Sequence, residues 1–350
     1  MTHLIQTPIQ RAQIAYLGFR ALQKTPPFHA FFALRLNHWV QQMLLPKDVS
    51  SHKEPIVLIG PPRTGTTFLH RFLHDNRIGR GPKLWEMMFP AQKAHWLIHK
   101  CIPVLDKISP TRHHPQHIHK TSLEAIEVEE AGFLFHFCDG YLFYAFTMAH
   151  AEEDFQWVMD PQKSSRMKDQ VTWLQRIWSQ YDQRPLSKVF SWGADVSQLQ
   201  NLLPKAKIVY TYRDPFQSIP STLSLLRAVL NQKFSFHQLP QYIQHRYYHR
   251  ITLGLVDLYR RFWMYYQQKP EGIYIVNQHQ MHSNFEPTMI KLLHWLDVNI
   301  HSELQQNIDQ QHIKNQSFTS QHRYSLEEFG ITEKELSELL SSIPFGVSSP

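Results

Sequence analysis

The chain has 350 residues and a formal net charge of +7, with 36 lysines and arginines against 29 aspartates and glutamates. This basic excess suits an anionic ligand, but no run of like charge marks a nucleic-acid-binding face. Two cysteines without paired spacing, Cys101 and Cys138, exclude a disulfide scaffold and a cysteine zinc site. The first residues lack the pattern of a secretory signal, so a reducing compartment, the cytoplasm, is expected.

The first 50 residues are predicted to form a helical extension before an α/β domain at residues 51–350. Two helices are expected there, separated at Pro26–Pro27, and the second covers Phe28 to Leu45. Its apolar residues recur at mixed helical spacing, which is typical of a helix that covers a sheet. A membrane surface or a docking partner would suit the same residues, and this alternative stays open.

A strand, a turn and a helix are predicted at residues 55–73. The spacing of Gly60, Gly65 and Thr67 follows the nucleotide-loop pattern G-x-x-x-x-G-K-[ST]. The lysine position holds a threonine, and the cation stands earlier, at Arg63. Backbone N–H groups at the positive end of the helix dipole can still bind a phosphate. The candidate ligands are Arg63, Thr64, Gly65, Thr66 and Thr67. A plain strand-to-helix turn is the alternative.

Two polar segments follow this helix. Glu86 stands between Trp85 and Met87, neighbours that would partly desolvate the carboxylate and raise its pKa towards the range of proton transfer. From the residues alone, an ordinary exposed loop glutamate explains Glu86 better. The segment His113–His119 is rich in histidine, but it holds no carboxylate and Pro115 breaks any helical register. We therefore expect a loop there and no metal site.

The most apolar stretch is Ala131–Ala149. It approaches the length of a bilayer-crossing helix, but His136, Asp139 and Gly140 interrupt its centre, where an ionisable group is costly in lipid. One or two buried helices are therefore predicted. The acidic pair Glu129–Glu130, just before it, is assigned to helix-start electrostatics.

The second half of the chain alternates helices and strands. Helices are predicted at residues 154–181, 221–229, 241–269 and 289–296, and strands at residues 188–192, 207–212 and 273–276. Ligands in parallel α/β sheets bind at the carboxyl ends of strands, which is where Arg213 emerges. An arginine can grip a phosphate with two hydrogen bonds, and Ser221 offers a further donor. A surface salt bridge with Asp214 is the alternative for Arg213 alone.

The tail carries two patterns of the capping-box type, Ser325–Glu328 and Thr332–Glu335. Arg323 or Lys314 is a candidate to close over a nucleotide. A plain helix-entry loop explains these two residues equally well.

Two of these segments resemble the sulfotransferases, which bind 3′-phosphoadenosine 5′-phosphosulfate (PAPS). The first is PRTGTT at Pro62–Thr67, directly after a strand. The second is R-D-P-x-x-x-x-P-S at Arg213–Ser221, a motif whose arginine and serine hold the 3′-phosphate in a bacterial branch of the family. The resemblance covers about Pro55 to Leu340, which is most of the chain.

The resemblance implies an α/β fold with a P-loop-like parallel sheet of four or five strands and helices on both faces. It implies transfer of a sulfonyl group from PAPS to a hydroxyl or amine of an unknown acceptor. The many aromatic residues of the middle segment suit an apolar or lipid-like acceptor, and core packing explains them equally well. Arg63 would neutralise charge at the leaving 5′-phosphate. Several branches place a general base slightly over twenty residues past this cation, and Glu86 follows Arg63 by 23 residues.

One departure from the family lies at Ser191–Gly193, where relatives commonly show Lys-Ser-Pro or Lys-Ala-Pro. If that lysine contacts the sulfonate in relatives, Lys188 or another cation replaces it here, or the contact is absent. A P-loop nucleotide kinase and a non-catalytic nucleotide-binding protein are the alternative functions.

The expected partners are the nucleotide donor and a small-molecule or lipid acceptor, without nucleic acid or metal. A homodimer and a peripheral position at the membrane stay open.

Overall fold

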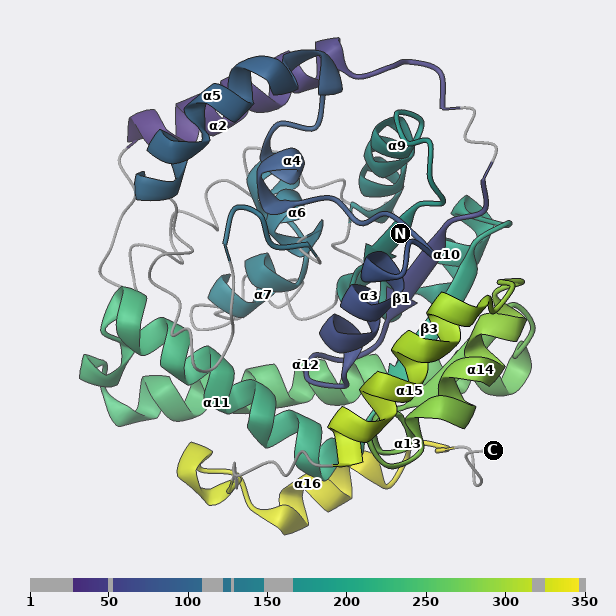
Figure 1. The fold of residues 1–350 in the computed structure, drawn as a ribbon. Coiled ribbons are helices and arrows are strands. Elements are labelled where there is room, and N and C mark those ends of the chain that lie inside the picture. The colour runs from purple at the N-terminus through teal and green to yellow at the C-terminus, as the bar shows by residue number, and fades with distance from the viewer. Residues whose placement is uncertain are drawn as a thin grey trace.

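The computed structural model describes residues 28–49, 53–108, 122–126, 129–147, 166–316 and 325–345. At its centre is an all-parallel sheet of four strands in the order β2-β1-β3-β4 (Figure 1). The strands are β1 (Ile56–Ile59), β2 (Leu186–Lys188), β3 (Lys207–Tyr212) and β4 (Ile273–Asn277). The order reverses at β1, and ligands of such sheets bind beyond the carboxyl ends of the strands at the reversal. The predicted α/β class and parallel sheet are confirmed.

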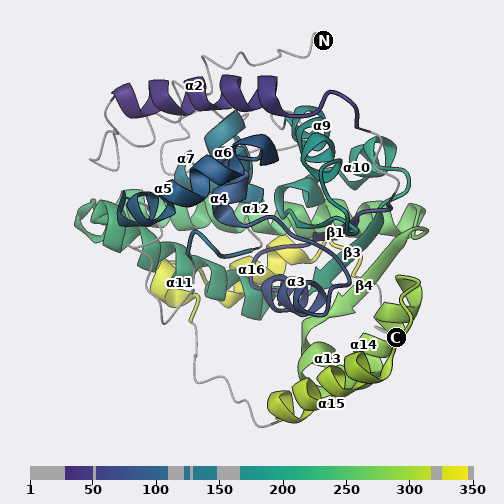
Figure 2. The ribbon, with the colours of Figure 1, turned by 45° about the horizontal axis from the view of Figure 1, so that its top comes forward.

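Both faces of the sheet are covered by helices. Successive side chains of a strand point to opposite faces, so a strand that is apolar throughout must be buried on both sides. Ile56 and Leu58 pack with one group of helices, and Val57 and Ile59 pack with the other. Figure 2 shows the two groups on opposite sides of the strands. The first group is α3 (Thr66–Asp75), α13 (Gln278–Ser283), α14 (Phe285–Trp295) and α15 (Ser302–Gln316). The second includes α9 (Met167–Trp178), α10 (Val196–Leu202), α11 (Pro215–Phe234), α12 (Gln241–Gln268) and α16 (Glu333–Leu340).

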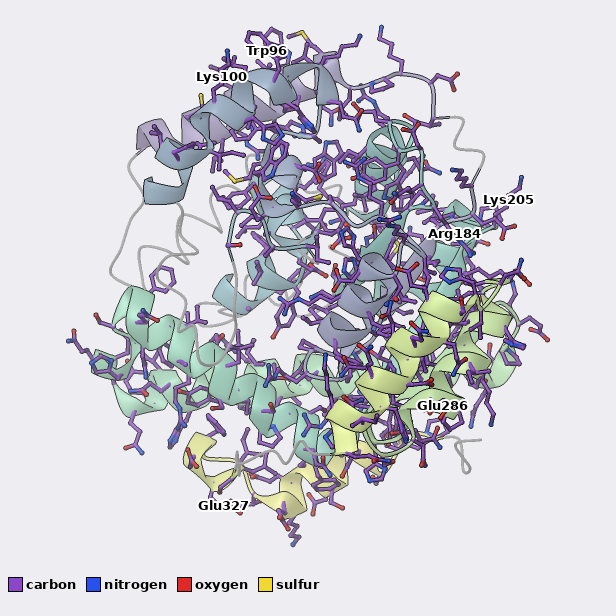
Figure 3. The ribbon with its side chains drawn as sticks, in the orientation of Figure 1. Trp96, Lys100, Arg184, Lys205, Glu286 and Glu327 are labelled. Carbon is purple, nitrogen blue, oxygen red and sulfur yellow. The ribbon has the colours of Figure 1, made fainter. Side chains whose placement is uncertain are left out.

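A third group of helices comes mostly from the first 150 residues. It contains α2 (Phe28–Leu44), α4 (Leu84–Met88), α5 (His95–Ile108), α6 (Glu129–Phe137) and α7 (Tyr141–Thr147). The predicted helix from Phe28 is confirmed as α2, and the helix expected before it lies outside the described residues. On α5, Trp96 and Lys100 lie at the outer edge of the molecule (Figure 3).

The apolar stretch of residues 131–149 breaks into α6 and α7, as predicted. Asp139 stands at the break and is fully buried. Its carboxylate accepts hydrogen bonds from the Tyr144 hydroxyl (2.7 Å), the Arg166 N–H (2.6 Å) and the Gln170 amide (2.7 Å). A buried charge with three donors belongs to a protein core rather than to lipid. Within the described ranges, no helix has the length and apolar character to cross a bilayer.

The strand predicted at residues 188–192 is wrong, because β2 ends at Lys188 and Ser191–Ala194 form a 3-10 helix. The reason lies in the acidic pair at the start of α6. Glu129 Oε1 accepts from the Lys188 N–H (3.1 Å), and Glu130 Oε1 accepts from the Ser191 N–H (2.8 Å). These carboxylates satisfy N–H groups at the open edge of the sheet and end the strand there. Lys188 therefore stands at the carboxyl end of β2.

Of the two tail patterns, Thr332–Glu335 is confirmed as a capping box that opens α16. The box predicted at Ser325–Glu328 is wrong. Ser325 Oγ accepts from the N–H of Glu327, which begins a 3-10 turn, and the Glu328 carboxylate pairs with Arg227 at 2.7 Å. That carboxylate is drawn towards a cation on α11 and away from the backbone of its own turn.

Candidate active site

The loop between β1 and α3 is pressed tightly against its neighbours. Gly60 has φ +132°, and a Cβ there would lie 2.4 Å from the carbonyl oxygen of Thr211 on β3. Gly65 has φ +88° and precedes the first residue of α3, where a Cβ would lie 2.8 Å from the Met281 methyl. Both positions need glycine, since other residues rarely adopt positive φ and lack the space here. The loop therefore runs along one fixed path into the helix.

Replacing Gly60 by alanine is expected to destabilise the protein by about 1 to 3 kcal/mol or more, through strain and the clash with β3. Denaturant unfolding measures this. Gly193→Ala is the matched control, because its Cβ would meet only the Gly60 nitrogen at 3.9 Å. Equal stability of the two variants would contradict the tight approach of the loop to β3.

The threonines of the loop differ in what they offer a ligand. Thr64 is fully buried; its hydroxyl donates to the Pro61 carbonyl (2.7 Å) and lies 2.6 Å from Thr211 Oγ1. Only its N–H is left for a ligand. Thr66 and Thr67 begin α3, whose first N–H groups have no acceptor within the helix. The first turn therefore presents donors and the positive end of the helix dipole to an anion.

Arg63, Arg213 and Ser221 are brought together from two distant segments. Arg63 adopts φ +65°, uncommon for a residue with a side chain, and its Nε donates to Ser221 Oγ at 3.0 Å. Arg213 Nη1 donates to the Arg63 carbonyl at 3.2 Å. Asp214 then caps α11 by accepting from the Phe216 N–H at 3.0 Å. The two motifs thus meet at the carboxyl ends of β1 and β3.

Lys188 adds a third cation to this group. From the sequence, it was only one possible replacement for the lysine missing at Ser191–Gly193. Its ammonium donates to Thr67 Oγ1 at 3.1 Å and lies 5.1 Å from the centre of the Phe190 ring. The residue is only 4% exposed. The loop lacks the usual lysine at Thr66, and a lysine of the neighbouring strand reaches the same helix turn instead. The end of a strand is where a ligand-binding residue is expected in such a sheet. The sequence pattern placed Lys188 at the start of a strand instead, so this indication was missed.

Glu129 lies directly beside this lysine. Its Oε1 accepts the Lys188 N–H and lies 4.0 Å from His70 Nε2. Its Oε2 is buried and has no hydrogen-bond partner among the described residues. Burial raises the pKa of Glu129 to about 7, while backbone hydrogen bonds and the Lys188 charge oppose that rise. Burial holds the pKa of His70 well below its usual value, and the nearby Lys188 charge lowers it further. Sequence reasoning gave Glu129 only an electrostatic role.

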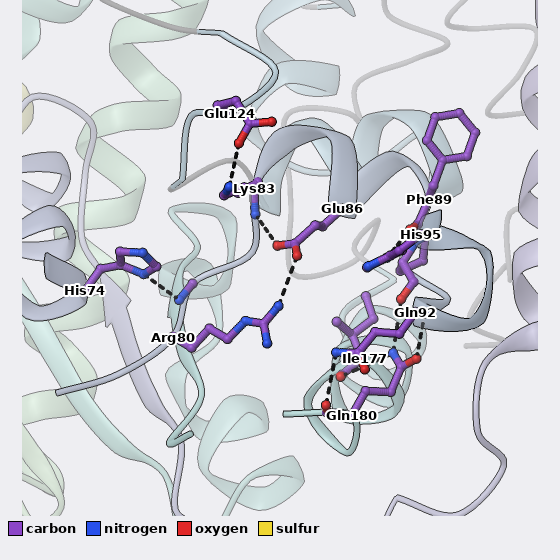
Figure 4. Close-up of polar contacts among 12 residues, drawn as sticks. His74, Arg80, Lys83, Glu86, Phe89, Gln92, His95, Glu124, Ile177 and Gln180 are labelled. Atoms are coloured by element: carbon purple, nitrogen blue, oxygen red, sulfur yellow. Dashed lines mark hydrogen bonds and ion pairs between the residues drawn. The ribbon is translucent and has the colours of Figure 1, made fainter. Parts of the chain in front are cut away.

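Glu86 is the third residue of α4 and belongs to a polar cluster (Figure 4). Its Oε2 accepts from the Lys83 N–H (2.8 Å) and its Oε1 from Arg80 Nη2 (3.0 Å). The residue is buried, so the alternative of an exposed loop glutamate is wrong. The Arg80 guanidinium lies 4.3 Å from the centre of the Tyr181 ring. Burial raises the pKa of Tyr181, and the carboxylates of Glu86 and Glu129 raise it further. Tyr181 therefore lies within electrostatic range of both carboxylates.

The described residues leave three predicted positions untested. Arg323 and the histidine-rich segment His113–His119 lie outside the described residues. Lys314 is exposed in the last turn of α15.

The profile of the sulfotransferase family matches residues 55–302, which includes the whole sheet and both phosphate motifs. Two solved structures share the fold. Sulfotransferase STF9 from Mycobacterium avium has a TM-score of 0.63 at 16% identity, over 97% of this chain and 86% of that one. Sulfotransferase STF1 from Mycobacterium tuberculosis H37Rv has a TM-score of 0.67 at 19% identity, over 88% and 82%. None of the curated protein sequences matches the chain. Since the family match covers well over half of its residues, the protein belongs to the sulfotransferase family and is an enzyme of that family.

Proposed function

We propose that the protein transfers a sulfonyl group from PAPS to a hydroxyl or amine of an acceptor. The observation that carries this proposal is the meeting of Arg63, Arg213 and Ser221 beside the N-terminus of α3. One phosphate-binding turn alone would suit many nucleotides. A second group of donors, from β3 and α11, fits a donor with phosphates at two positions.

The residues present suit such a nucleotide. The amides of Arg63 to Thr67 would hold the 5′-phosphate, and Arg213 with Ser221 would hold the 3′-phosphate. PAPS supplies a sulfonyl group on a phosphate leaving group. In the transfer, the bond from sulfur to the 5′-phosphate oxygen breaks and a bond from sulfur to the acceptor oxygen or nitrogen forms. The acceptor proton passes to a carboxylate of the protein.

Two cations would stabilise the charge that develops during transfer. Arg63 stands in the loop, and Lys188 contacts the first turn of α3 from β2. Preorganised cations and amides in a buried site act strongly on such charge. We propose that Lys188 does the work of the lysine that relatives carry at the positions of Ser191–Gly193.

Two carboxylates are candidate general bases. The spacing of Glu86 from Arg63 along the chain supports Glu86 as the general base. Both of its carboxylate oxygens, however, already accept hydrogen bonds. Glu129 has a buried oxygen without a hydrogen-bond partner in the described part of the chain, a pKa of about 7 and a place beside Lys188. A base with a pKa near the working pH is effective in proton transfer. We therefore favour Glu129.

Aromatic side chains beside the cations support an apolar acceptor. Phe190 lies under the Lys188 ammonium and packs edge-to-face on Tyr141, with ring centres 5.7 Å apart. Burial raises the pKa of Tyr141, and the positive charge of Arg63 opposes that rise, so Tyr141 lies within the field of this cation. An acceptor hydroxyl could approach the cations while its apolar body packs on these rings. With Cys138 buried and Cys101 unpaired, we propose the cytoplasm as the compartment.

Nucleotide binding tests the proposal. The product 3′-phosphoadenosine 5′-phosphate is expected to raise the melting temperature more than ATP or adenosine 5′-phosphosulfate, which lack the 3′-phosphate. Arg213→Ala should weaken its binding by roughly 2 to 4 kcal/mol, because a charge-assisted contact is lost. Ser221→Ala should cost less. Titration calorimetry gives both values. Equal affinity for all three nucleotides would contradict the role of Arg213 and Ser221.

A further inference from the structure

Helix α2 has its polar side turned towards the protein. Asn37 Nδ2 donates to the Met88 carbonyl (2.8 Å), and Gln41 Oε1 accepts from the Ala91 N–H (3.0 Å). His38 and His136 approach through their Nδ1 atoms at 3.2 Å, and Arg35 donates to the Phe135 carbonyl. The side chains that hold α2 to α4 and α6 are therefore polar.

The outward side of α2 is apolar instead. Leu36, Trp39 and Met43 follow one another at helical spacing, and all three are exposed, Trp39 to 58%. A surface helix of a soluble protein shows the opposite pattern, with its apolar stripe towards the core. This inversion indicates that the outer face of α2 meets an apolar medium or partner.

Helix α5 extends the apolar surface. Ile98 and Ile102 pack inward on Leu84 and Trp85, which fixes the helix to α4. Trp96, Leu97 and Val104 of the same helix are exposed, Trp96 to 66%. Both helices lie at the upper edge of the molecule in Figure 1, where Figure 3 places Trp96, and Figure 2 shows them apart from each other with α6 between them. We name the exposed side chains of α2 and α5 the outer face; they are Leu36, Trp39, Met43, Leu44, Trp96, Leu97 and Val104.

Positive charge predominates around the outer face, with Asp48 and Asp106 directly beyond the two segments that form it. Residues 33–47 and 93–105 contain no aspartate or glutamate. Lys47, Lys93 and Lys100 are exposed among them, and the Lys100 ammonium lies 5.3 Å from the centre of the Trp96 ring. Tryptophan with neighbouring lysine is typical of segments at the lipid headgroup level, where the ring enters the interface and the ammonium stays at the phosphates.

We propose that the outer face binds the surface of an anionic lipid bilayer, with α2 and α5 lying on the membrane. The apolar residues would enter the headgroup boundary, and the lysines would meet anionic lipids. A second copy of the chain fits less well, because the same lysines would then face one another. The proposal does not depend on sulfonyl transfer. If both hold, the membrane would deliver an apolar acceptor, since α6, which begins with Glu129, packs against α2.

Vesicle sedimentation with the full chain tests the proposal, without nucleotide or acceptor. Wild-type protein is expected to sediment with vesicles of phosphatidylcholine that contain one-third phosphatidylglycerol, and less with phosphatidylcholine alone. The double variant Trp39→Ser/Trp96→Ser should bind the anionic vesicles at least roughly tenfold more weakly, as expected when large apolar side chains no longer enter the interface. Lys93→Gln/Lys100→Gln should remove the preference for anionic vesicles.

The matched control is Tyr242→Ser/Ile313→Ser, which removes two apolar side chains of similar exposure, 69% and 66%, from α12 and α15. It should bind like wild type. Brominated lipids should quench wild-type tryptophan fluorescence more strongly than that of the tryptophan double variant. An unchanged melting temperature and nucleotide response show that each variant is folded.

Absence of wild-type binding to anionic vesicles would overturn the proposal. Equal loss in the control variant would overturn it as well. A concentration-dependent dimer that only the tryptophan variant loses, without vesicle binding, would assign the outer face to a second copy of the chain.

Discussion

Glu129→Gln is expected to slow the chemical step by roughly 10² to 10⁴-fold while nucleotide affinity stays near that of wild type. The glutamine keeps the shape of the side chain and can still accept from the Lys188 N–H, but it cannot take a proton. The group lost is the carboxylate oxygen Oε2, which has no hydrogen-bond partner among the residues that the structure describes. Single-turnover transfer from PAPS, with binding of 3′-phosphoadenosine 5′-phosphate measured alongside, separates chemistry from binding.

Two further variants make this result specific. Glu130→Gln changes the next residue of the same helix turn, whose oxygens accept the backbone N–H groups of Ser191 and Tyr141. It should lower stability and keep a near-normal rate. Glu86→Gln tests the other candidate base. A large loss in Glu86→Gln beside a near-normal Glu129→Gln would return the base to Glu86 and leave Glu129 with a structural role.

The pH dependence gives an independent readout of Glu129. A base must be deprotonated, so kcat/KM should rise with pH through about 7, the pKa of the buried carboxyl. Stability should change in the opposite sense. The folded state binds the proton more tightly than the unfolded state, so stability falls as pH rises from about 4.5 to about 7. Glu130 contributes in the same direction. Glu129→Gln should flatten part of this slope in thermal unfolding.

The parts of the site that lie in one continuous segment were predictable from the sequence. Gly60, Arg63 and Gly65 reveal the turn because glycine spacing and a helix start are local features. Arg213 and Ser221 were equally predictable from the sequence, since a buried strand precedes the arginine and the helix that follows carries the serine. That these two segments meet follows from parallel strands, whose carboxyl ends share one edge of a sheet.

The parts that depend on contacts between distant segments were not predictable. Lys188 was placed at the start of a strand, because a strand of three residues leaves little periodicity and carboxylates from α6 decide where it ends. The unpartnered oxygen of Glu129 exists only because α6 packs on β2. The sequence does not reveal that the Thr64 hydroxyl is held inside the fold by Thr211 of a neighbouring strand, which leaves Thr64 only the backbone N–H that was predicted as a ligand.

Arg63→Ala and Lys188→Met should each lower the single-turnover rate by roughly 10² to 10³-fold, the usual effect of removing one preorganised donor from a developing charge. Arg63→Ala should leave the melting temperature nearly unchanged, because within the described residues its side chain makes a single hydrogen bond, to Ser221. Lys205→Met is the charge-matched control; Lys205 is exposed, before the amino end of β3 and away from the site. Retained activity in Arg63→Ala would place the catalytic cation elsewhere, with Lys188 as the first replacement.

Lys188→Met also has a consequence that a purely structural lysine would not share. The ammonium lowers the pKa of Glu129, so its removal should move that pKa upward and shift the rising limb of kcat/KM to more alkaline pH. Arg63→Ala should lower the rate with a smaller shift, because Lys188 is the cation among the main influences on the pKa of Glu129. A lower rate with an unmoved pH limb in Lys188→Met would mean that Glu129 is not the base. The two variants together therefore test whether the cation of β2 and the carboxylate of α6 act on the same proton transfer.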